Sequence, residues 1–488
     1  MRKLKGKLAV MMAAGVTAAW MLGTPDAYAA SKVDTALNAS NQAANTVRDN
    51  ERAVRDEASK TNASIDTASL NLKINSVKVV GNHSMGEKRI LDLLPELSKE
   101  TANVRMLSKQ IQMANDTGAL SMKTVFTPNA EGGYDVTVNV EEKDPDKFII
   151  GVSNTGNEYT GNWRTSLSYI NTNASQNADT IGLAYVTSPA HWSDVKQAAF
   201  SYRRLLPKAS SSIVFGASYS DVSLGSVSSY AGLFDLNASG TGATVGMHYQ
   251  YNLAYTSREK DIWDVGIDYR RSDNDYDWRS QYLSNTSYDY HTDMLSLAFI
   301  HNNRSEHDSF TYTLGYATNL DGSKEDYEKA TPGSDHRFNI WKAGASYQYK
   351  TPSDWIIGAR AYGQYTNNNI VSMEQFGAGG QSSVRGFDER VISSDYGYMG
   401  SLEIYTPQVM KNSRFVLFYD AAKLFNNNSY SSLYTRTLSS YGIGYRLNDI
   451  ADGISLAVDY AIPASDIDHR DLGERGHKRW NMSLSYSF

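Results

Sequence analysis

The sequence predicts a mainly β fold, in which a 16-stranded antiparallel transmembrane β-barrel follows one small α+β domain. From residue 146 to the C-terminus, apolar and polar residues alternate in short runs, as in strands with one lipid-facing and one lumen-facing side. The connections between these runs are alternately short and long. The composition agrees, with 33 Tyr and 36 Gly but only 10 Pro, and a mean hydropathy of -0.47 that does not suit helical membrane spans.

The N-terminal residues have the features of a secretory signal peptide. Four basic residues precede an apolar stretch from Leu8 to Leu22, and the small residues Ala27 and Ala29 follow it. About 15 apolar residues are too few to span a bilayer, so we expect cleavage after Ala29, with residues 1–29 removed from an exported chain. Residues 30–71 are rich in Ala, Asn, Ser and charge, which indicates a linker or a marginal helix.

Composition and motifs exclude several classes of function. The chain has no cysteine, so neither a disulfide framework nor a thiolate metal site is available to it. A net charge of -6 without a basic stripe argues against nucleic acid as a partner. The sequence has no G-x-S-x-G elbow, H-E-x-x-H pair or P-loop, and its nine histidines are scattered. We therefore expect no enzyme activity, no cofactor and no metal site.

Residues 72–144 differ from the segments on either side and predict the α+β domain. A strand-like run stops at Gly81, two stretches with helical spacing follow, and Pro128 ends the first of two further strand-like runs. About 70 residues can bury a modest core when two helices pack on one face of such a sheet. The expected order is strand, helix, helix, strand, strand, over Ile74–Val80, Glu87–Leu94, 104–114, Met122–Thr127 and 134–141.

Residues 146–488 contain sixteen candidate strands, an even number, as bacterial outer-membrane barrels have. The alternation is clearest where Trp263, Val265, Ile267 and Tyr269 share one face. The candidate strands lie near 147–154, 161–170, 178–187, 195–205, 210–221, 241–255, 260–272, 287–301, 308–318, 337–350, 354–366, 396–407, 413–422, 439–447, 453–462 and 478–488.

The connections alternate in length, as expected when short periplasmic turns and long external loops join the strands of an outer-membrane barrel. This phase places the N-terminal domain and both ends of the barrel chain in the periplasm. The rule weakens near the start, because the connection at 155–160 is short and the one at 171–177 is not. The short connections lie near 206–209, 256–259, 302–307, 351–353, 408–412 and 448–452, and the long ones near 222–240, 273–286, 319–336, 367–395, 423–438 and 463–477.

A soluble β-sandwich or propeller would also show alternating strands, but no blade-length repeat is present, and a closed barrel leaves no strand edge unpaired in lipid. The last strand sets Trp480, Met482, Leu484, Tyr486 and Phe488 on one face and hydroxyl-rich residues on the other. A terminal strand that ends in an aromatic residue resembles the signal read by the outer-membrane assembly machinery. Trp480, Tyr486 and Phe488 are the candidates for that signal.

One motif in the longest connection carries a family resemblance. Residues 379–389 have the sequence GGQSSVRGFDE. It resembles the signature of the superfamily of outer-membrane insertases and transporters that join periplasmic POTRA domains to a barrel. Together with 395–398 and 402–407, it is most similar to the two-partner secretion transporters, also called haemolysin secretion/activation proteins, and the resemblance extends from about residue 72 to the C-terminus. The loop motif comprises Gly379, Gly380, Val384, Arg385, Gly386 and Phe387.

The residues of the motif themselves suggest a loop that folds into the lumen. Glycines allow tight turns and close approach of backbones, so Arg385 would be a fixed cation inside the barrel rather than a solvated loop arginine. On the strand near 413–422, the period of two turns Phe418, Asp420 and Ala422 inward. The family has an aromatic-x-Asp-x-Gly pattern there, whose Asp contacts the loop arginine. Phe418 and Asp420 match it, whereas Ala422 replaces the usual glycine.

The resemblance implies a transporter in the outer membrane. A POTRA domain over residues 72–144 would capture the unfolded N-terminal secretion domain of a partner exoprotein in the periplasm, and the barrel over 146–488 would conduct that client to the cell surface. In some relatives an N-terminal helix plugs the pore, so residues 30–71 are either a linker or such a plug. Other expected partners are outer-membrane lipids and the assembly machinery that inserts the barrel.

Three other functions stay open at this point. Two-partner transporters usually carry two POTRA domains, and this sequence has room for one. An assembly factor of the same superfamily, which inserts other barrels into the membrane, is the main alternative. A passive porin or a displayed adhesin would explain neither the α+β domain nor the loop motif.

Overall fold

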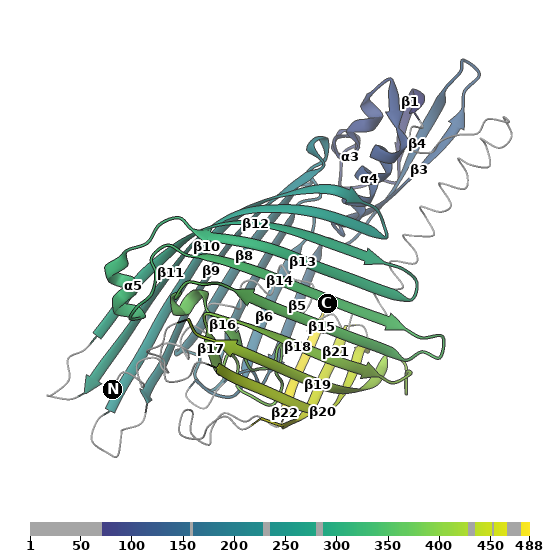
Figure 1. Cartoon of the computed structure of the whole chain (residues 1–488). Coiled ribbons are helices and arrows are strands. Elements are labelled where there is room, and N and C mark those ends of the chain that lie inside the picture. Colours follow the sequence, from purple (N-terminus) through teal and green to yellow (C-terminus); the bar gives the residue numbers. More distant parts are fainter. Residues whose placement is uncertain are drawn as a thin grey trace.

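The computed structural model describes residues 71–156, 160–227, 235–279, 286–427, 435–450, 453–465 and 480–488. These form a closed barrel with a small α+β domain at one end (Figure 1). The expected signal peptide and the segment up to residue 70 lie outside the described residues. Within the described part of the chain, no helix is both long and apolar enough to cross a membrane.

The N-terminal domain has a four-stranded sheet of order β2-β1-β4-β3, in which β1 runs parallel to β4 and the other pairs are antiparallel. The expected order of elements is present, with a short 3₁₀ helix and a three-residue strand added between the two helices. The elements are β1 (Asn71–Val80), α3 (Glu87–Leu93), η2 (Pro95–Ser98), β2 (Thr101–Asn103), α4 (Val104–Asn115), β3 (Leu120–Pro128) and β4 (Tyr134–Glu142).

The core of this domain is apolar. α4 begins after Asn103, whose side chain accepts a hydrogen bond from the backbone N–H of Met106, and its helical spacing turns Leu107 inward. Leu107 packs with Leu120 of β3 and Val138 of β4, and all three side chains are buried. The helices therefore bury their apolar stripe against one face of the sheet, as in other small α+β domains.

The barrel has sixteen antiparallel strands and closes where the last strand, β22, pairs with the first, β5. Each expected strand is present. The strands are β5 (Asp146–Ser153), β6 (Arg164–Asn171), β7 (Thr180–Thr187), β8 (Val195–Leu206), β9 (Ser211–Val227), β10 (Asp235–Tyr255), β11 (Glu259–Arg279), β12 (Thr286–Arg304), β13 (Asp308–Asn319), β14 (Asn339–Lys350), β15 (Ile356–Tyr365), β18 (Tyr396–Tyr405), β19 (Ser413–Phe425), β20 (Thr435–Ile450), β21 (Ile454–Pro463) and β22 (Trp480–Ser487).

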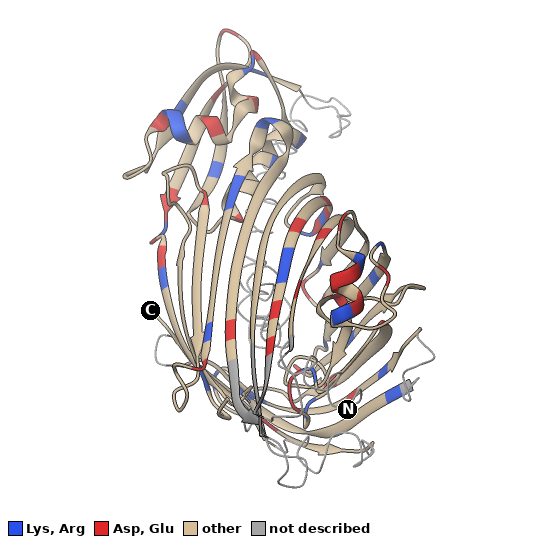
Figure 2. Ribbon diagram, turned by 90° about the vertical axis from the view of Figure 1, so that its left-hand side faces the viewer, with Lys and Arg blue, Asp and Glu red and all other residues tan. Residues whose placement is uncertain are grey.

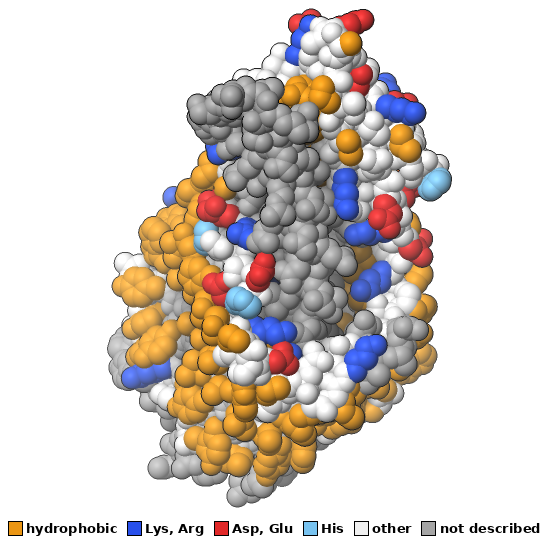
Figure 3. Space-filling view, turned by 90° about the vertical axis from the view of Figure 1, so that its right-hand side faces the viewer, with side chains coloured by type: hydrophobic (Ala, Val, Ile, Leu, Met, Phe, Trp, Pro, Cys, Tyr) orange, Lys and Arg blue, Asp and Glu red, His pale blue; other side chains and the backbone are white. Residues whose placement is uncertain are grey.

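Apolar side chains cover the outside of the barrel and polar ones line its inside. On β19, Phe415, Leu417 and Tyr419 are 43%, 56% and 49% exposed, whereas the alternate residues Phe418 and Asp420 are buried. Figure 3 shows hydrophobic side chains gathered over the outer surface of the barrel on the face in view. Acidic and basic residues occur on neighbouring strands of the wall (Figure 2). The barrel thus has the polarity expected of a protein surrounded by lipid.

Two of the expected long connections are wrong in their bounds. Much of 222–240 and of 273–286 is strand, because β9 to β12 run for 17 to 21 residues, whereas about 9–11 residues span a bilayer. The added residues are polar, which made them resemble loops. Outside the membrane, neither face of a strand has to be apolar. Pairing between strands still provides hydrogen-bond partners for the backbone N–H and C=O groups there.

The connection between β6 and β7 is long because it contacts the N-terminal domain. Ala178 in this connection is 1% exposed and belongs to the apolar core of that domain. Asn177 beside it accepts a hydrogen bond from Arg89 of α3. The departure from the short-turn rule near the start of the barrel is therefore a docking contact.

Helix α4 docks on the same rim of the barrel. Met113 packs with Leu205 of β8 and Tyr255 of β10. Asp116, just after the helix, lies 2.6 Å from the Nζ of Lys260 on β11. The N-terminal domain thus lies against the ends of β8 to β11 at one rim of the barrel.

Candidate functional site in the barrel lumen

Residues 366–395 connect β15 to β18, and we call them the lumen loop. The loop contains η4 (Ser372–Glu374) and a small hairpin formed by β16 (Phe376–Ala378) and β17 (Ile392–Ser394). Its apolar side chains pack on the inner faces of β19 and β20 instead of facing solvent. The cluster consists of Ala378, Val384, Phe387, Ile392, Ala422, Leu424 and Leu438, each no more than 3% exposed.

The glycines of the motif are required by the backbone of the lumen loop. Gly379, Gly380 and Gly386 have φ values of 111°, 103° and 91°, a region that other residues rarely adopt. A Cβ atom on Gly379 would lie 2.4 Å from the carbonyl oxygen of Asp388. The tight fold of the tip brings the chain around so that Arg385 points into the wall.

Arg385 and Asp420 form a bidentate ion pair. The Nε of Arg385 donates to Oδ2 of Asp420 at 2.7 Å, and Nη2 donates to Oδ1 at 2.8 Å. The backbone N–H of Arg385 also donates to Asp420, at 3.1 Å. The side chains of Arg385 and Asp420 are 2% and 0% exposed. This geometry is the strong, oriented form of a charge-assisted hydrogen bond, and it fixes both the side chain and the main chain of the loop.

Further groups on the wall complete the surroundings of Arg385. Its Nη2 lies 2.8 Å from Oε1 of Glu403 on β18, and its Nη1 lies 3.7 Å from Oδ2 of Asp459 on β21. The guanidinium carbon is 3.6 Å from the ring centroid of Phe418, a cation–π contact. Arg446 of β20 binds Asp459 at 2.8 Å. Three carboxylates and two guanidinium groups therefore form one buried network.

The tip of the loop also reaches the last strand. The backbone N–H of Gly386 donates to Oδ1 of Asn481 at 3.2 Å, and the side chain of Gln381 donates to Oγ of Ser483 at 3.4 Å. Both acceptors are on β22, the strand that closes the barrel. The loop thus contacts β18, β19, β21 and β22 from inside.

The start of the lumen loop is held by the opposite part of the wall. Nη1 of Arg270 on β11 donates hydrogen bonds to both carboxylate oxygens of Glu374, each at 2.9 Å. Thr292 of β12 donates to the same carboxylate at 3.1 Å. Neither residue belongs to a motif, so the sequence did not predict this pair. The one signal in the sequence was that the period of two turns Arg270 into the lumen, next to the outward-facing Tyr269.

The other predicted residues take separate places. Val384 and Phe387 lie in the loop cluster, and Ala422 fits there without glycine, at 3% exposure. Trp480, Tyr486 and Phe488 face outward, away from the loop, at 53%, 44% and 57% exposure. Phe488 pairs through its backbone with Phe148, and their rings stack with centroids 5.7 Å apart.

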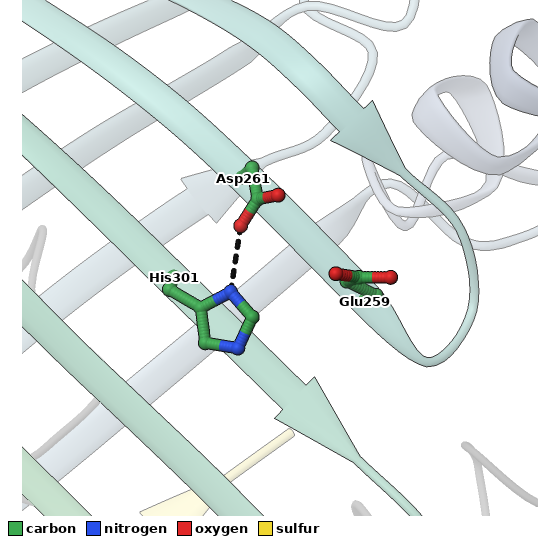
Figure 4. A group of neighbouring side chains, drawn as sticks. All are labelled: Glu259, Asp261 and His301. Carbon is green, nitrogen blue, oxygen red and sulfur yellow. Dashed lines mark hydrogen bonds and ion pairs between the residues drawn. The ribbon is translucent and has the colours of Figure 1, made fainter.

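Among the residues that the structure describes, two groups of side chains have the composition of metal ligands. In the first, Asp261 of β11 and His301 of β12 point toward one another, with Glu259 at the strand end (Figure 4). Oδ1 of Asp261 is 2.6 Å from Nδ1 of His301, and the two residues are direct neighbours across the strands. A cross-strand hydrogen bond at the rim of the barrel accounts for this group. The second group is His291, Asp293 and Asp321.

The chain resembles known outer-membrane proteins. The model of the family described as haemolysin secretion/activation protein ShlB/FhaC/HecB matches residues 132–447. The outer membrane transporter CdiB of Dickeya dadantii is 31% identical over 110 residues, which is 22% of this chain and 20% of that protein. CdiB of Escherichia coli O6:K15:H31 is 35% identical over 77 residues, 16% of this chain and 13% of that protein. The matches thus span a fifth or less of these curated relatives.

Solved structures share the fold at low sequence identity. CdiB from Escherichia coli has a TM-score of 0.71 and 16% identity, over 85% of this chain and 76% of that one. CdiB from Acinetobacter baumannii has a TM-score of 0.67 and 16% identity, over 86% and 74%. BamA from Haemophilus ducreyi lacking POTRA domains 1-3 has a TM-score of 0.55 and 15% identity, over 86% and 85%.

Proposed function

Because the chain belongs to the haemolysin secretion/activation protein family, we propose that it moves a partner exoprotein across the outer membrane, from the periplasm to the cell surface. The observation that carries the proposal is the buried ion pair between Arg385 and Asp420, which holds the loop in the lumen. Both curated relatives are outer membrane transporters. The transport step is binding and release of a chain, without covalent chemistry.

The N-terminal domain, residues 72–144, is proposed to be a POTRA domain that binds the client. β3 is the longer of the two outer strands of its sheet in the described part of the chain, and Val125 on that strand is 50% exposed. An extended segment of the client, from its unfolded N-terminal secretion domain, can add to such an edge by main-chain hydrogen bonds. Because α4 lies at the barrel rim, a segment bound there is delivered close to the lumen.

The lumen loop is proposed to hold the resting state. An extended polypeptide needs the space that the loop occupies, so transport requires the loop to move. Removing one member of a buried ion pair leaves the other charge without compensation, which costs about 3–5 kcal/mol. The docked loop is therefore a stable state that the arriving client must displace. Folding of the client outside the cell supplies direction.

The assembly factor is the second candidate, and the closing seam favours it. β22 and β5 share five register pairs, the fewest of the sixteen strand pairings in the described barrel. An insertase would open this seam toward the membrane. The greater structural similarity to CdiB, with a TM-score of 0.71 against 0.55 for BamA, supports the transporter.

The test is to compare cells that carry Arg385→Ala with wild-type cells and with cells that carry Arg271→Ala. Arg271 is a matched control, because it also pairs with an aspartate on the barrel but its side chain is 51% exposed. We expect Arg385→Ala to remove one or a few large exoproteins from the cell surface and medium, as measured by mass spectrometry. Arg271→Ala should leave them unchanged.

The abundance of unrelated outer-membrane barrels distinguishes the two candidates. If Arg385→Ala depletes many barrels together, the protein is an assembly factor and the transporter proposal is wrong. The level of the variant itself in the membrane is measured alongside, so that a loss of folding is not read as a loss of transport.

A further inference from the structure

Glu374 is a buried carboxylate at the start of the lumen loop, outside the loop motif. Its side chain is 1% exposed. Nη1 of Arg270 donates to both carboxylate oxygens of Glu374, each at 2.9 Å. The hydroxyl of Thr292 adds a third contact at 3.1 Å. A carboxylate buried this deeply is held in place by its partners, because a buried charge without a partner destabilises the folded protein.

Arg270 is itself held by the wall. Its Nη2 lies 3.3 Å from Oδ2 of Asp268, and Asp268 is in turn 3.4 Å from Nε2 of His248 on β10. His248 also bonds Asp264 at 2.7 Å. Arg270 is therefore a fixed point of a polar network on β10 and β11, and Glu374 is the member of that network contributed by the lumen loop.

The two ion pairs of the lumen loop lie on opposite parts of the barrel. In the strand order around the barrel of sixteen strands, β19 is the sixth strand from β11, and β21 is the eighth, directly opposite β11. Arg270 is on β11, and Arg385 reaches Asp420 on β19 and Asp459 on β21. The segment from Glu374 to Arg385 thus runs across the lumen between two anchors.

We propose that the pair of Glu374 and Arg270 is a second anchor of the lumen loop, so that the loop clears the lumen only when both ion pairs break. The proposal rests on the proposed function, because it concerns the resting state of the same transporter. With one anchor removed, opening requires only the remaining ion pair to break, so the loop clears the lumen more often. With two, it stays across the lumen, and Glu374 is a positioning residue for transport.

The first test measures ion conductance of the full-length purified protein in planar lipid bilayers. Glu374→Gln keeps the shape of the side chain and removes its charge. We expect the fraction of time in large open states to rise by about tenfold or more, because a buried arginine loses its counter-charge. Glu325→Gln is the matched control, since Glu325 is on helix α5 (Lys324–Ala330), outside the lumen loop, with a side chain that is 79% exposed, and it should leave the fraction unchanged.

Combining substitutions tests whether the anchors act separately. If they do, the effects of Glu374→Gln and Arg385→Ala on opening multiply, as expected for sites that share no partner. The exchanged pair, Arg270→Glu with Glu374→Arg, should return conductance toward that of the wild type. A purely structural role for Glu374 would lower the yield of folded barrel without raising conductance, and that result overturns the proposal.

A cross-link tests the anchor in the folded protein by replacing the ion pair with a covalent connection between the loop and the wall. The chain contains no cysteine, so Thr292→Cys with Glu374→Cys gives two thiols that a short bis-maleimide can join. Cross-linked protein should stay in the small-conductance state even when Arg385→Ala is present. If it opens as freely as Arg385→Ala alone, the anchor does not hold the loop.

The two measurements separate this proposal from the proposed function. If Glu374→Gln leaves conductance unchanged while Arg385→Ala abolishes secretion, the second anchor is wrong and the transporter stands. If Glu374→Gln raises conductance but no exoprotein depends on the protein, the anchor is supported and the transporter is wrong.

Discussion

The N-terminal domain and the barrel bury opposite kinds of residue within one chain. In the domain, Leu107, Leu120 and Val138 are at most 2% exposed and form an apolar core. In the barrel, Arg385 and Asp420 are equally buried, while leucines such as Leu417 face outward. The difference follows from what surrounds each part, water around the domain and lipid around the barrel. Burial alone therefore does not identify a stabilising apolar core in this protein.

The largest expected difference concerns the core of the domain. Leu107→Ala should destabilise the N-terminal domain by about 2–5 kcal/mol, because it removes buried methyl groups and leaves a cavity. The matched barrel variant is Leu417→Ala, which leaves no internal cavity, because Leu417 is 56% exposed on the outer face.

Limited proteolysis of the full-length protein in lipid vesicles measures the effect on each part. The domain of Leu107→Ala should be cut faster while the barrel resists, and Leu417→Ala should match the wild type in both parts. Equal sensitivity of the N-terminal domain in the two variants would contradict the contrast.

An added charge on the outer surface should destabilise the barrel but not the N-terminal domain. Leu417→Arg should cost about 2–4 kcal/mol near the middle of the membrane, because an arginine on the lipid face is poorly solvated. Val125→Arg is the control on the domain, where the side chain is 50% exposed to water. Urea titrations of folding into vesicles should show a shift for Leu417→Arg only. No shift would mean that this face of β19 is not in contact with lipid.

The smallest effect is a pH dependence confined to the domain. Burial opposes ionisation of Glu142, but hydrogen bonds from the Ser84 side chain and from the backbone N–H groups of Met85, His83 and Ser84 outweigh it, lowering the pKa of Glu142 from 4.5 to about 2. Because the folded pKa is the lower one, the ionised side chain stabilises the domain above about pH 4.5, and this stabilisation is lost between pH 4.5 and 2.

Glu142→Gln is the variant that checks this. The rate of proteolysis of the domain is measured at a series of pH values between 6 and about 3. As the pH falls, this rate should rise less steeply in the variant than in the wild type, because only the wild type loses a charged hydrogen-bond acceptor. Equal slopes would show that Glu142 does not contribute.

The sequence was sufficient for the strands of the barrel because lipid imposes a strict alternation on them. It failed where that constraint ends, at the extensions of β9 to β12, whose polar residues outside the membrane resemble loops. The pairing of Arg385 with Asp420 followed from the family resemblance and the period of two on β19. The contact of Glu374 with Arg270 could not be predicted, since it depends on how a 30-residue loop crosses the lumen between distant strands.

The most direct test of transport through the lumen is site-specific photo-cross-linking to an exoprotein stalled by a folded domain at its C-terminus. A photoreactive residue in place of Gln250, which lies on the lumen side of β10 and bonds Asp264, should form adducts with the stalled chain. The same residue in place of Leu484, 47% exposed on the outer face of β22, should form none. Adducts at Leu484 and none at Gln250 would contradict transport through the lumen and place the client at the seam between β22 and β5.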